Sequence, residues 1–169
     1  MSRKKLYAVL ICLLVVGSVC AQGFPWGDFK RRTMKELIKI NNDDSAEDFK
    51  RVTHPNGLIV RGNVLPSVVR VTFTGEERSM GKTRKKFIEL WGTALSHKKE
   101  YQDRYQREFL FKEDADEYWL PVQEPVIKYF EKELKTGEFV DLYLVRPGGI
   151  KTGDNVDWVF LVEEFQKPK

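Results

Sequence analysis

The first 21 residues limit what the rest of the chain can fold into. Three cations at residues 3–5 precede an apolar run at residues 6–16, and small residues follow as far as Ala21. This order is the signature of a cleaved secretory signal peptide. The apolar run is about half the length of roughly 20 residues that a membrane-crossing helix needs. We therefore expect residues 1–21 to be removed, and we expect no transmembrane segment in the mature chain.

Removal of this segment also removes every thiol. Cys12 and Cys20 both lie within it. A mature chain without cysteine excludes a disulfide scaffold, a zinc–cysteine site and a cysteine nucleophile. The remaining 148 of the 169 residues are enough for one domain that is stabilised by its core.

The same features indicate the compartment. Small proteins secreted through the endoplasmic reticulum usually have disulfides and often an Asn-x-Ser/Thr sequon, and this chain has no such sequon. We expect an exported bacterial protein, periplasmic or secreted. The alternative is a lipid anchor at Cys20, although Gly17 and Val19 do not fit the pattern that lipoprotein signals normally show.

Charge gives little support to a polyanion as partner. The full chain has 29 Lys and Arg against 25 Asp and Glu, a net charge of +4. Residues 1–21 hold three of these cations and no carboxylate, so the mature balance is 26 against 25. A near-neutral chain lacks the overall basicity typical of nucleic-acid binding. We expect no nucleic-acid partner.

Residues 22–57 are expected to form an N-terminal helix and loop that pack on the core. Asp28 is a typical N-cap residue, and an amphipathic pattern follows it. The apolar face carries Phe29, Met34, Leu37 and Ile40. The opposite face is basic and suits either solvent or an anionic membrane surface. Residues 41–57 are predicted to be loop and turn because Asn, Asp, Pro and Gly recur there.

Residues 58–169 are expected to form an α+β core domain. Apolar patterns predict strands at 58–60, 69–73, 109–111, 118–120, 139–145 and 157–162. Helical spacing predicts helices at 82–97, around Tyr101 and Tyr105, and at 126–134. The last two strands are continuously apolar, which predicts burial on both faces, and a long loop is expected between them. The fold class is a single α+β domain with a curved antiparallel sheet or small β-barrel of about six strands and inserted helices.

One segment imitates a phosphate-binding loop. Gly75 and Gly81 stand between a predicted strand and a predicted helix, but five residues separate them and the motif requires four. We therefore expect no nucleotide cofactor. Five cations nevertheless gather there, namely Arg78, Lys82, Arg84, Lys85 and Lys86. They form either a solvated surface or a site for the phosphate or sulfate group of an envelope lipid or polysaccharide.

Other chemistry finds less support. Ser79 lacks the preceding glycine of a nucleophile elbow, His54 lies in a predicted turn, and His97 falls at a predicted helix end. The acidic residues 113–117 lack the spacing of a calcium loop. We predict no catalytic residue, metal or cofactor. Trp26, between Pro25 and Gly27, either holds the N-terminus against the core or belongs to a partner-binding patch.

These observations favour an exported, non-enzymatic module that binds a protein or an envelope component. Two alternatives stay open. The first is a small secreted hydrolase whose site is assembled from scattered residues, with His54, His97, Ser79 or acids as candidates. The second is a binder of anionic envelope lipid or polysaccharide that uses the basic residues between Arg78 and Lys86.

Overall fold

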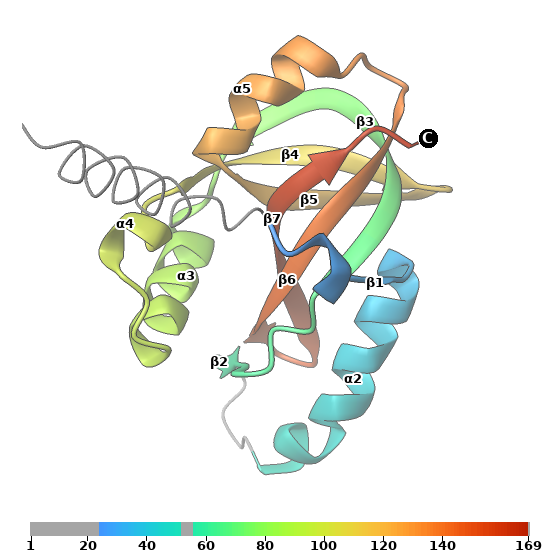
Figure 1. The fold of residues 1–169 in the computed structure, drawn as a ribbon. Coiled ribbons are helices and arrows are strands. Elements are labelled where there is room, and N and C mark those ends of the chain that lie inside the picture. The colour runs from blue at the N-terminus through green and yellow to red at the C-terminus, as the bar shows by residue number, and fades with distance from the viewer. Residues whose placement is uncertain (1–23, 52–55, 169) are drawn as a thin grey trace, which may run out of the picture.

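The structure is a computed structural model that describes residues 24–51 and 56–168. Within these ranges, one sheet of seven strands is accompanied by four α-helices and a short 3₁₀ turn (Figure 1). This confirms the predicted α+β class. The predicted signal peptide, both cysteines and His54 lie outside the described residues.

The elements follow one another along the chain with short connections. The strands are β1 (Lys30–Arg31), β2 (Asn56–Val60), β3 (Ser67–Ser79), β4 (Tyr105–Glu113), β5 (Asp116–Gln123), β6 (Phe139–Thr152) and β7 (Asn155–Gln166). The helices are α2 (Met34–Arg51), α3 (Lys82–Ala94), α4 (Lys99–Gln102) and α5 (Glu124–Glu133), and the 3₁₀ turn η1 is Trp26–Asp28.

Five of the strands close into a ring. Strands β3, β4 and β5 pair in sequence, and β6 returns after α5 to lie beside β3, which is a Greek key. Strand β7 then pairs with β6 and reaches β5 to close the ring in the order β3-β4-β5-β7-β6. This is the connectivity of a partly open five-stranded barrel of the OB type. The pairings are antiparallel except for β1 with β3 and β5 with β7.

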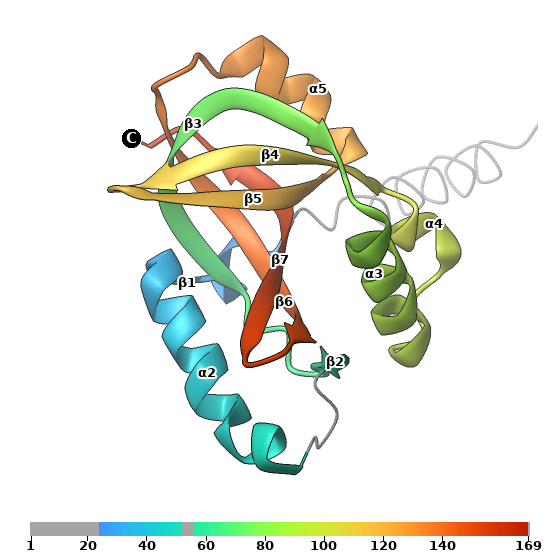
Figure 2. The same cartoon turned by 180° about the vertical axis from the view of Figure 1, so that it is seen from behind.

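The curvature of the ring depends on β3. One half of this strand pairs with β6 and the other half with β4, so the strand must bend between them (Figure 2). The bend contains a bulge between Phe73 and Glu77, with Gly75 at a φ of +80°. Gly75 therefore belongs to a bent strand and not to a phosphate-binding loop.

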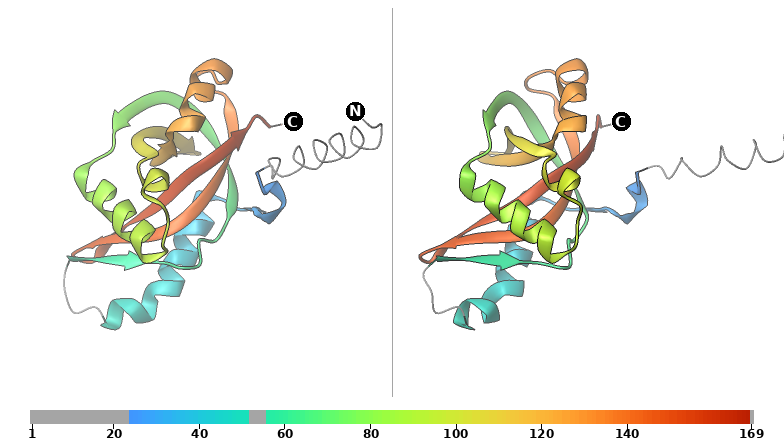
Figure 3. Two further views of the ribbon diagram at one scale, coloured as in Figure 1. Left: turned by 60° about the vertical axis from the view of Figure 1, so that its left-hand side comes forward. Right: turned by 90° about the vertical axis from the view of Figure 1, so that its left-hand side faces the viewer.

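The core has two parts because β7 is buried on both faces, as its apolar run predicts. Phe160 and Val162 lie in the main cluster inside the ring, which α2 and α5 help to cover. Val159 and Leu161 lie in a second cluster on the other face, under α3. Helices α2 and α3 flank the turn of the β6–β7 hairpin from different sides (Figure 3).

The N-terminal helix differs from its prediction. Asp28 does not cap it but ends the 3₁₀ turn, and the helix begins at Met34. Thr33 and Glu36 form a capping box there. The backbone N–H of Glu36 donates to the Thr33 hydroxyl at 3.0 Å, and the backbone N–H of Thr33 donates to the Glu36 carboxylate at 2.7 Å. The prediction of loop and turn at residues 41–57 was wrong for residues 41–51, because the helix continues to Arg51. The side chain of Asn41 donates to the carbonyl of Leu37 within the helix and accepts from Arg146 of β6, and these contacts support a stretch of low helix propensity.

Two further predictions needed correction. Tyr105 does not belong to a helix but begins β4, and α4 has only four residues. The long loop predicted between β6 and β7 is instead a two-residue turn at residues 153–154, since Thr152 pairs with Asn155. Strand β6 stays paired with β7 as far as Thr152. Gly148, at a φ of +136°, lets the backbone of β2 approach β6 closely.

Candidate functional site

The ring is weakest between β5 and β7. The register pairs these strands only at Val122 and Val162, whereas the other neighbours in the ring pair over several residues. Beyond this pair the two strands diverge (Figure 2), which leaves a gap in the strand pairing between them. We call this gap the seam. Sheet edges that lack a neighbouring strand offer backbone groups to other partners.

A cavity of about 290 Å³ lies at the seam. We call it the seam pocket. It is lined by Met34 and Ile38 of α2, Glu117, Tyr118, Trp119 and Leu120 of β5, Val156, Asp157, Trp158 and Phe160 of β7, and Arg78 and Arg84. Two open hollows of about 410 and 580 Å³ share residues with it, one at the start of α3 and one between α2 and the β4–β5 turn. The seam pocket is thus the centre of a longer groove.

Two of the predicted anion-binding residues meet at the rim of this pocket. Glu108, whose side chain is 1% exposed, accepts a hydrogen bond from Nε of Arg78 at 2.7 Å and another from Nη1 of Arg84. Arg84 also donates to both oxygens of Asp157, at 2.9 and 2.6 Å, and to the carbonyl of Trp119 at 2.8 Å. Burial lowers the pKa of Arg84, but Asp157 and Glu108 raise it above its ordinary value.

The side chain of Arg78 is held in place, but only part of its hydrogen-bonding capacity is used. Its guanidinium lies 4.1 Å from the ring centroid of Trp119, and only its Nε is occupied, by Glu108. Its two Nη groups have no acceptor among residues 24–51 and 56–168, and its side chain is 47% exposed. Glu108 and Trp119 therefore fix the guanidinium of a residue that lines both the seam pocket and the adjoining hollow.

Two other donors of the seam pocket lack partners. Tyr118 and Trp119 line it, and neither the Tyr118 hydroxyl nor the Trp119 indole N–H is hydrogen-bonded to another described residue. Burial, followed by the charges of Asp116, Glu113 and Asp114, raises the pKa of Tyr118 to about 12. The Tyr118 hydroxyl is therefore protonated at neutral pH and is able to donate a hydrogen bond.

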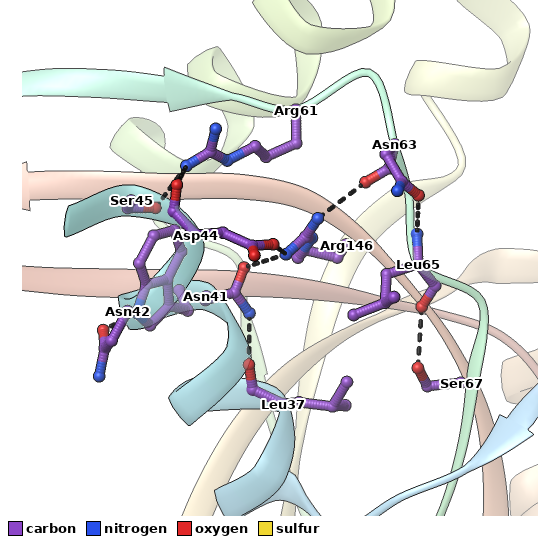
Figure 4. A network of polar contacts seen from close by, with 11 residues as sticks. Leu37, Asn41, Asn42, Asp44, Ser45, Arg61, Asn63, Leu65, Ser67 and Arg146 are labelled. Atoms are coloured by element: carbon purple, nitrogen blue, oxygen red, sulfur yellow. Dashed lines mark hydrogen bonds and ion pairs between the residues drawn. The ribbon is translucent and has the colours of Figure 1, made fainter. Parts of the chain in front are cut away.

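A polar network holds α2 as one wall of the pocket (Figure 4). Arg146, with 3% of its side chain exposed, pairs with Asp44 at 2.9 Å and donates to Oδ1 of Asn41 at 3.1 Å. Trp158 donates its indole N–H to Oδ1 of Asn42 at 2.8 Å. Since three polar residues of α2 are fixed in this way, Met34 and Ile38 are held against the seam.

The remaining predicted cations do not join this rim as one cluster. Lys82 is exposed at the start of α3 and lines the adjoining hollow of about 410 Å³. Lys85 lines a different hollow, of about 240 Å³, beside Gln106, and Lys86 is exposed. The structure thus divides the basic segment, and an anion-binding role for these residues stays a prediction.

Trp26 lies on the outside of the ring. Its ring centroid is 4.6 Å from that of Tyr143 on β6 and 4.5 Å from that of Phe24. Phe29 also contacts Tyr143, so the N-terminal segment is attached to β6 by aromatic contacts. Trp26 is still 39% exposed, and its partner-binding role stays a prediction.

Two of the residues proposed for a hydrolase, Ser79 and His97, are not brought together, and His54 lies outside the described residues. Ser79 precedes α3 and His97 follows it, so the length of a 13-residue helix, about 20 Å, separates the ends where they lie. His97 contacts Trp91 and Tyr101 through its ring. Tyr101 donates to the partly buried Glu163 at 2.6 Å, and Tyr105 also donates to it. Desolvation raises the pKa of Glu163. This cluster attaches α4 to β7.

Sequence reasoning missed Glu108, Trp119 and Asp157. The sequence does offer a hint for Glu108, because a carboxylate directly before the apolar run of β4 is a candidate for a buried charge that needs a partner. Its partner became visible only through the β3–β4 register, which places Arg78 opposite Glu108. Trp119 was assigned to a strand, but the sequence pattern did not show that this strand borders an opening.

Comparisons with known proteins add no function. No protein-family model and no curated protein sequence matches this chain. Within the described residues, no group of three or more His, Cys, Asp or Glu side chains is placed to hold a metal ion. None of the helices in those same ranges has the length and apolar character required to cross a membrane. Function must therefore be argued from the site itself.

Proposed function

We propose that this chain is an exported, non-enzymatic binding module and that the seam pocket holds its partner, a protein or an envelope component. The observation that carries the proposal is the state of Arg78. Its guanidinium is fixed by Glu108 and Trp119, yet two of its donor groups have no acceptor in the described protein. Mixed apolar and polar lining with a few convergent donors is typical of ligand pockets.

The carboxylates around the pocket favour binding over catalysis. The oxygens of Glu108 and Asp157 accept hydrogen bonds from Arg78 and Arg84. A general base must be free to take a proton from the substrate, and these two groups are engaged by permanently charged donors. The geometry thus supports a recognition site.

Export is the part of the proposal that rests on residues 1–21. The mass of the intact protein, purified from the cells that make it, tests this step. A chain that begins at Gln22 supports cleavage of a signal peptide. A lipid-modified chain that begins at Cys20 keeps export and adds an anchor. An uncleaved chain of 169 residues would contradict the proposed export.

Site-specific photocrosslinking tests the binding site. A photoreactive phenylalanine at Tyr118, in the pocket, is compared with the same residue at Tyr129, an exposed position on α5 that does not line the pocket. We expect a defined crosslinked partner from position 118 only, and its loss when Val156→Trp fills the pocket. Equal products from both positions, or a product that survives Val156→Trp, would contradict the proposal.

A second candidate function is supported by the start of α3. Gly81 occupies the N-cap position without a side-chain cap, and Lys82 lines the hollow beside it. Uncapped N–H groups and a cation favour a phosphate or sulfate group of an envelope lipid or polysaccharide. This candidate predicts that Lys82→Gln, unlike Lys85→Gln, lowers retention on vesicles containing phosphatidylglycerol at low salt. Retention that both variants leave unchanged would exclude it.

A further inference from the structure

Several side-chain donors that line the seam pocket have no partner among the described residues. The unpaired donors are the two Nη groups of Arg78, the Tyr118 hydroxyl and the Trp119 indole N–H. Both oxygens of Asp157 accept from Arg84, and one oxygen of Glu117 pairs with Lys112 at 2.9 Å. An occupant that supplies acceptors can therefore use donors that the described protein leaves without a partner.

The pocket also requires an apolar part in its occupant. Met34, Ile38, Val156 and Phe160 contribute apolar side chains to its lining. Its volume is about 290 Å³. A cavity of about 150 Å³ is enough for a benzene ring, so there is room for one ring and a short acidic arm. The occupant is thus a single ring-sized group and not an extended cofactor.

Hydrogen-bonding geometry favours a single carboxylate over a dianionic group. Around the rim, the charges of Arg78 and Arg84 are balanced by Glu108 and Asp157. The remaining attraction comes from the open fork of Arg78, whose two parallel donors match the two oxygens of one carboxylate. A dianionic group would bring a second charge toward Glu108 and Asp157 without a second free cation in the seam pocket.

We propose that the seam pocket binds a carboxylate that is attached to a ring-sized apolar group, with the carboxylate on the Nη groups of Arg78 and the apolar group between α2 and β7. This inference rests on the proposed function and names the chemistry of its ligand. Two sources supply that chemistry. One is a free aromatic acid, and the other is the C-terminus of a polypeptide that ends in a large apolar residue.

Calorimetric titration of the mature chain with 3-phenylpropionate tests the chemistry, with 3-phenylpropan-1-ol as the matched neutral probe. We expect saturable binding of the acid and at least about tenfold weaker binding of the alcohol. Arg78→Lys keeps the positive charge but loses the two parallel donors of the guanidinium. It should weaken binding of the acid about tenfold and leave the affinity for the alcohol unchanged. Lys82 is a nearby cation that does not line the seam pocket. The Lys82→Gln variant should therefore bind the acid with the affinity of the wild type.

Filling the pocket provides an independent test. Val156→Trp should abolish binding of the acid, and circular dichroism checks that the variant folds. Ile38→Trp replaces it if folding fails. Equal affinity for acid and alcohol, an unchanged affinity in Arg78→Lys, or binding that survives a folded Trp variant would overturn the inference. If the crosslinked partner from Tyr118 persists while neither the acid nor a peptide with a free C-terminal carboxylate binds, the ligand assignment fails and the proposed function stands.

Two peptides distinguish the sources. Acetyl-Gly-Gly-Phe with a free C-terminal carboxylate is compared with its C-terminal amide. Binding of the free peptide but not the amide assigns the site to a polypeptide C-terminus. Binding of 3-phenylpropionate with neither peptide assigns it to a small acid. Failure of both the acid and the free peptide to bind would reject the proposal.

Discussion

Two buried carboxylates in this protein each lie between two arginines, yet the two clusters leave different groups free. Asp141 on β6 accepts two hydrogen bonds from Arg31 and two from Arg70, at 2.8–3.3 Å. Glu108 on β4 is shared in a different way. Arg84 divides its donors among Glu108, Asp157 and a backbone carbonyl, and Arg78 gives only its Nε.

The difference follows from the position of each cluster on the ring. Asp141 lies where β3 and β6 pair continuously, and the N-terminal segment adds Arg31 from outside. Glu108 lies near the seam, where Arg84 donates a hydrogen bond to the backbone carbonyl of Trp119 and the guanidinium of Arg78 lies over the Trp119 ring. In the Asp141 cluster, Arg31 leaves only its Nε and Arg70 only one Nη group without an acceptor among the described residues. In the Glu108 cluster, Arg78 leaves both of its Nη groups without a described acceptor. A free pair of parallel donors on one guanidinium, and not the presence of arginine, distinguishes the seam from the Asp141 clamp.

The largest expected effect is on Glu108. Its side chain is 1% exposed and its partner Arg84 is 17% exposed, so Glu108→Ala leaves a buried cation with fewer partners. We expect a loss of about 3 kcal/mol in the free energy of unfolding, measured by urea denaturation. Glu108→Gln keeps an acceptor in a side chain of similar size, so its free energy of unfolding should fall by less. Binding of 3-phenylpropionate should also weaken because Arg78 is released.

Asp141→Ala should lower the free energy of unfolding by less, about 2 kcal/mol at pH 7. Arg31 and Arg70 are half exposed, so water can solvate them when Asp141 is removed. Ligand binding should be unchanged. If Asp141→Ala destabilises the protein more than Glu108→Ala, or removes binding of the acid, the contrast between the two clusters fails.

The Asp141 cluster should also depend on pH. Burial raises the pKa of Asp141, but hydrogen bonds from Arg70 and Arg31 outweigh it and lower the pKa from 3.8 to about 2. Since the folded pKa lies below the unfolded one, this stabilisation is present above about pH 4 and is lost as pH falls through 2. Urea denaturation at pH 7, 4 and 2 should show the gap between wild type and Asp141→Ala narrowing. A gap that stays constant over this range would contradict the clamp.

Trp26→Ala should have the smallest effect. The aromatic contacts with Tyr143 and Phe24 support the N-terminal segment, and their loss should cost about 1 kcal/mol in the free energy of unfolding. Thermal unfolding measures this, and titration with 3-phenylpropionate should be unaffected. A folded Trp26→Ala variant that no longer crosslinks its partner would instead assign the binding site to the N-terminal segment.

The fold could be predicted where local pattern and tertiary structure agree. The helical spacing of Phe87 and Trp91 predicted α3, and the apolar run around Phe160 predicted a strand buried on both faces. The extension of α2 was missed because Asn41 and Ser45 are poor helix formers on their own. They are buried and hydrogen-bonded to the protein, partly through Arg146 and Arg61, which lie far away in the sequence.

The candidate site was only partly visible for the same reason. Arg78 and Arg84 stood out as cations near a predicted helix start, but the sequence grouped them with Lys85 and Lys86, which lie elsewhere. Their partners come from the register of β3 with β4 and from the approach of β7 to β5. Closure of a ring is a property of strand pairs and is not encoded in the periodicity of any one strand.

The central claim is that the seam, and not the Asp141 clamp, is the binding surface. Titration of the ¹⁵N-labelled mature chain with 3-phenylpropionate, followed by heteronuclear NMR, tests it most directly. The account predicts saturable shifts of the Trp119 indole N–H, the Arg78 Nε–H and the backbone amides of residues 34–38 and 156–160. Shifts that concentrate instead on Trp26, Arg31 and Tyr143, or no saturable shift at all, would contradict it.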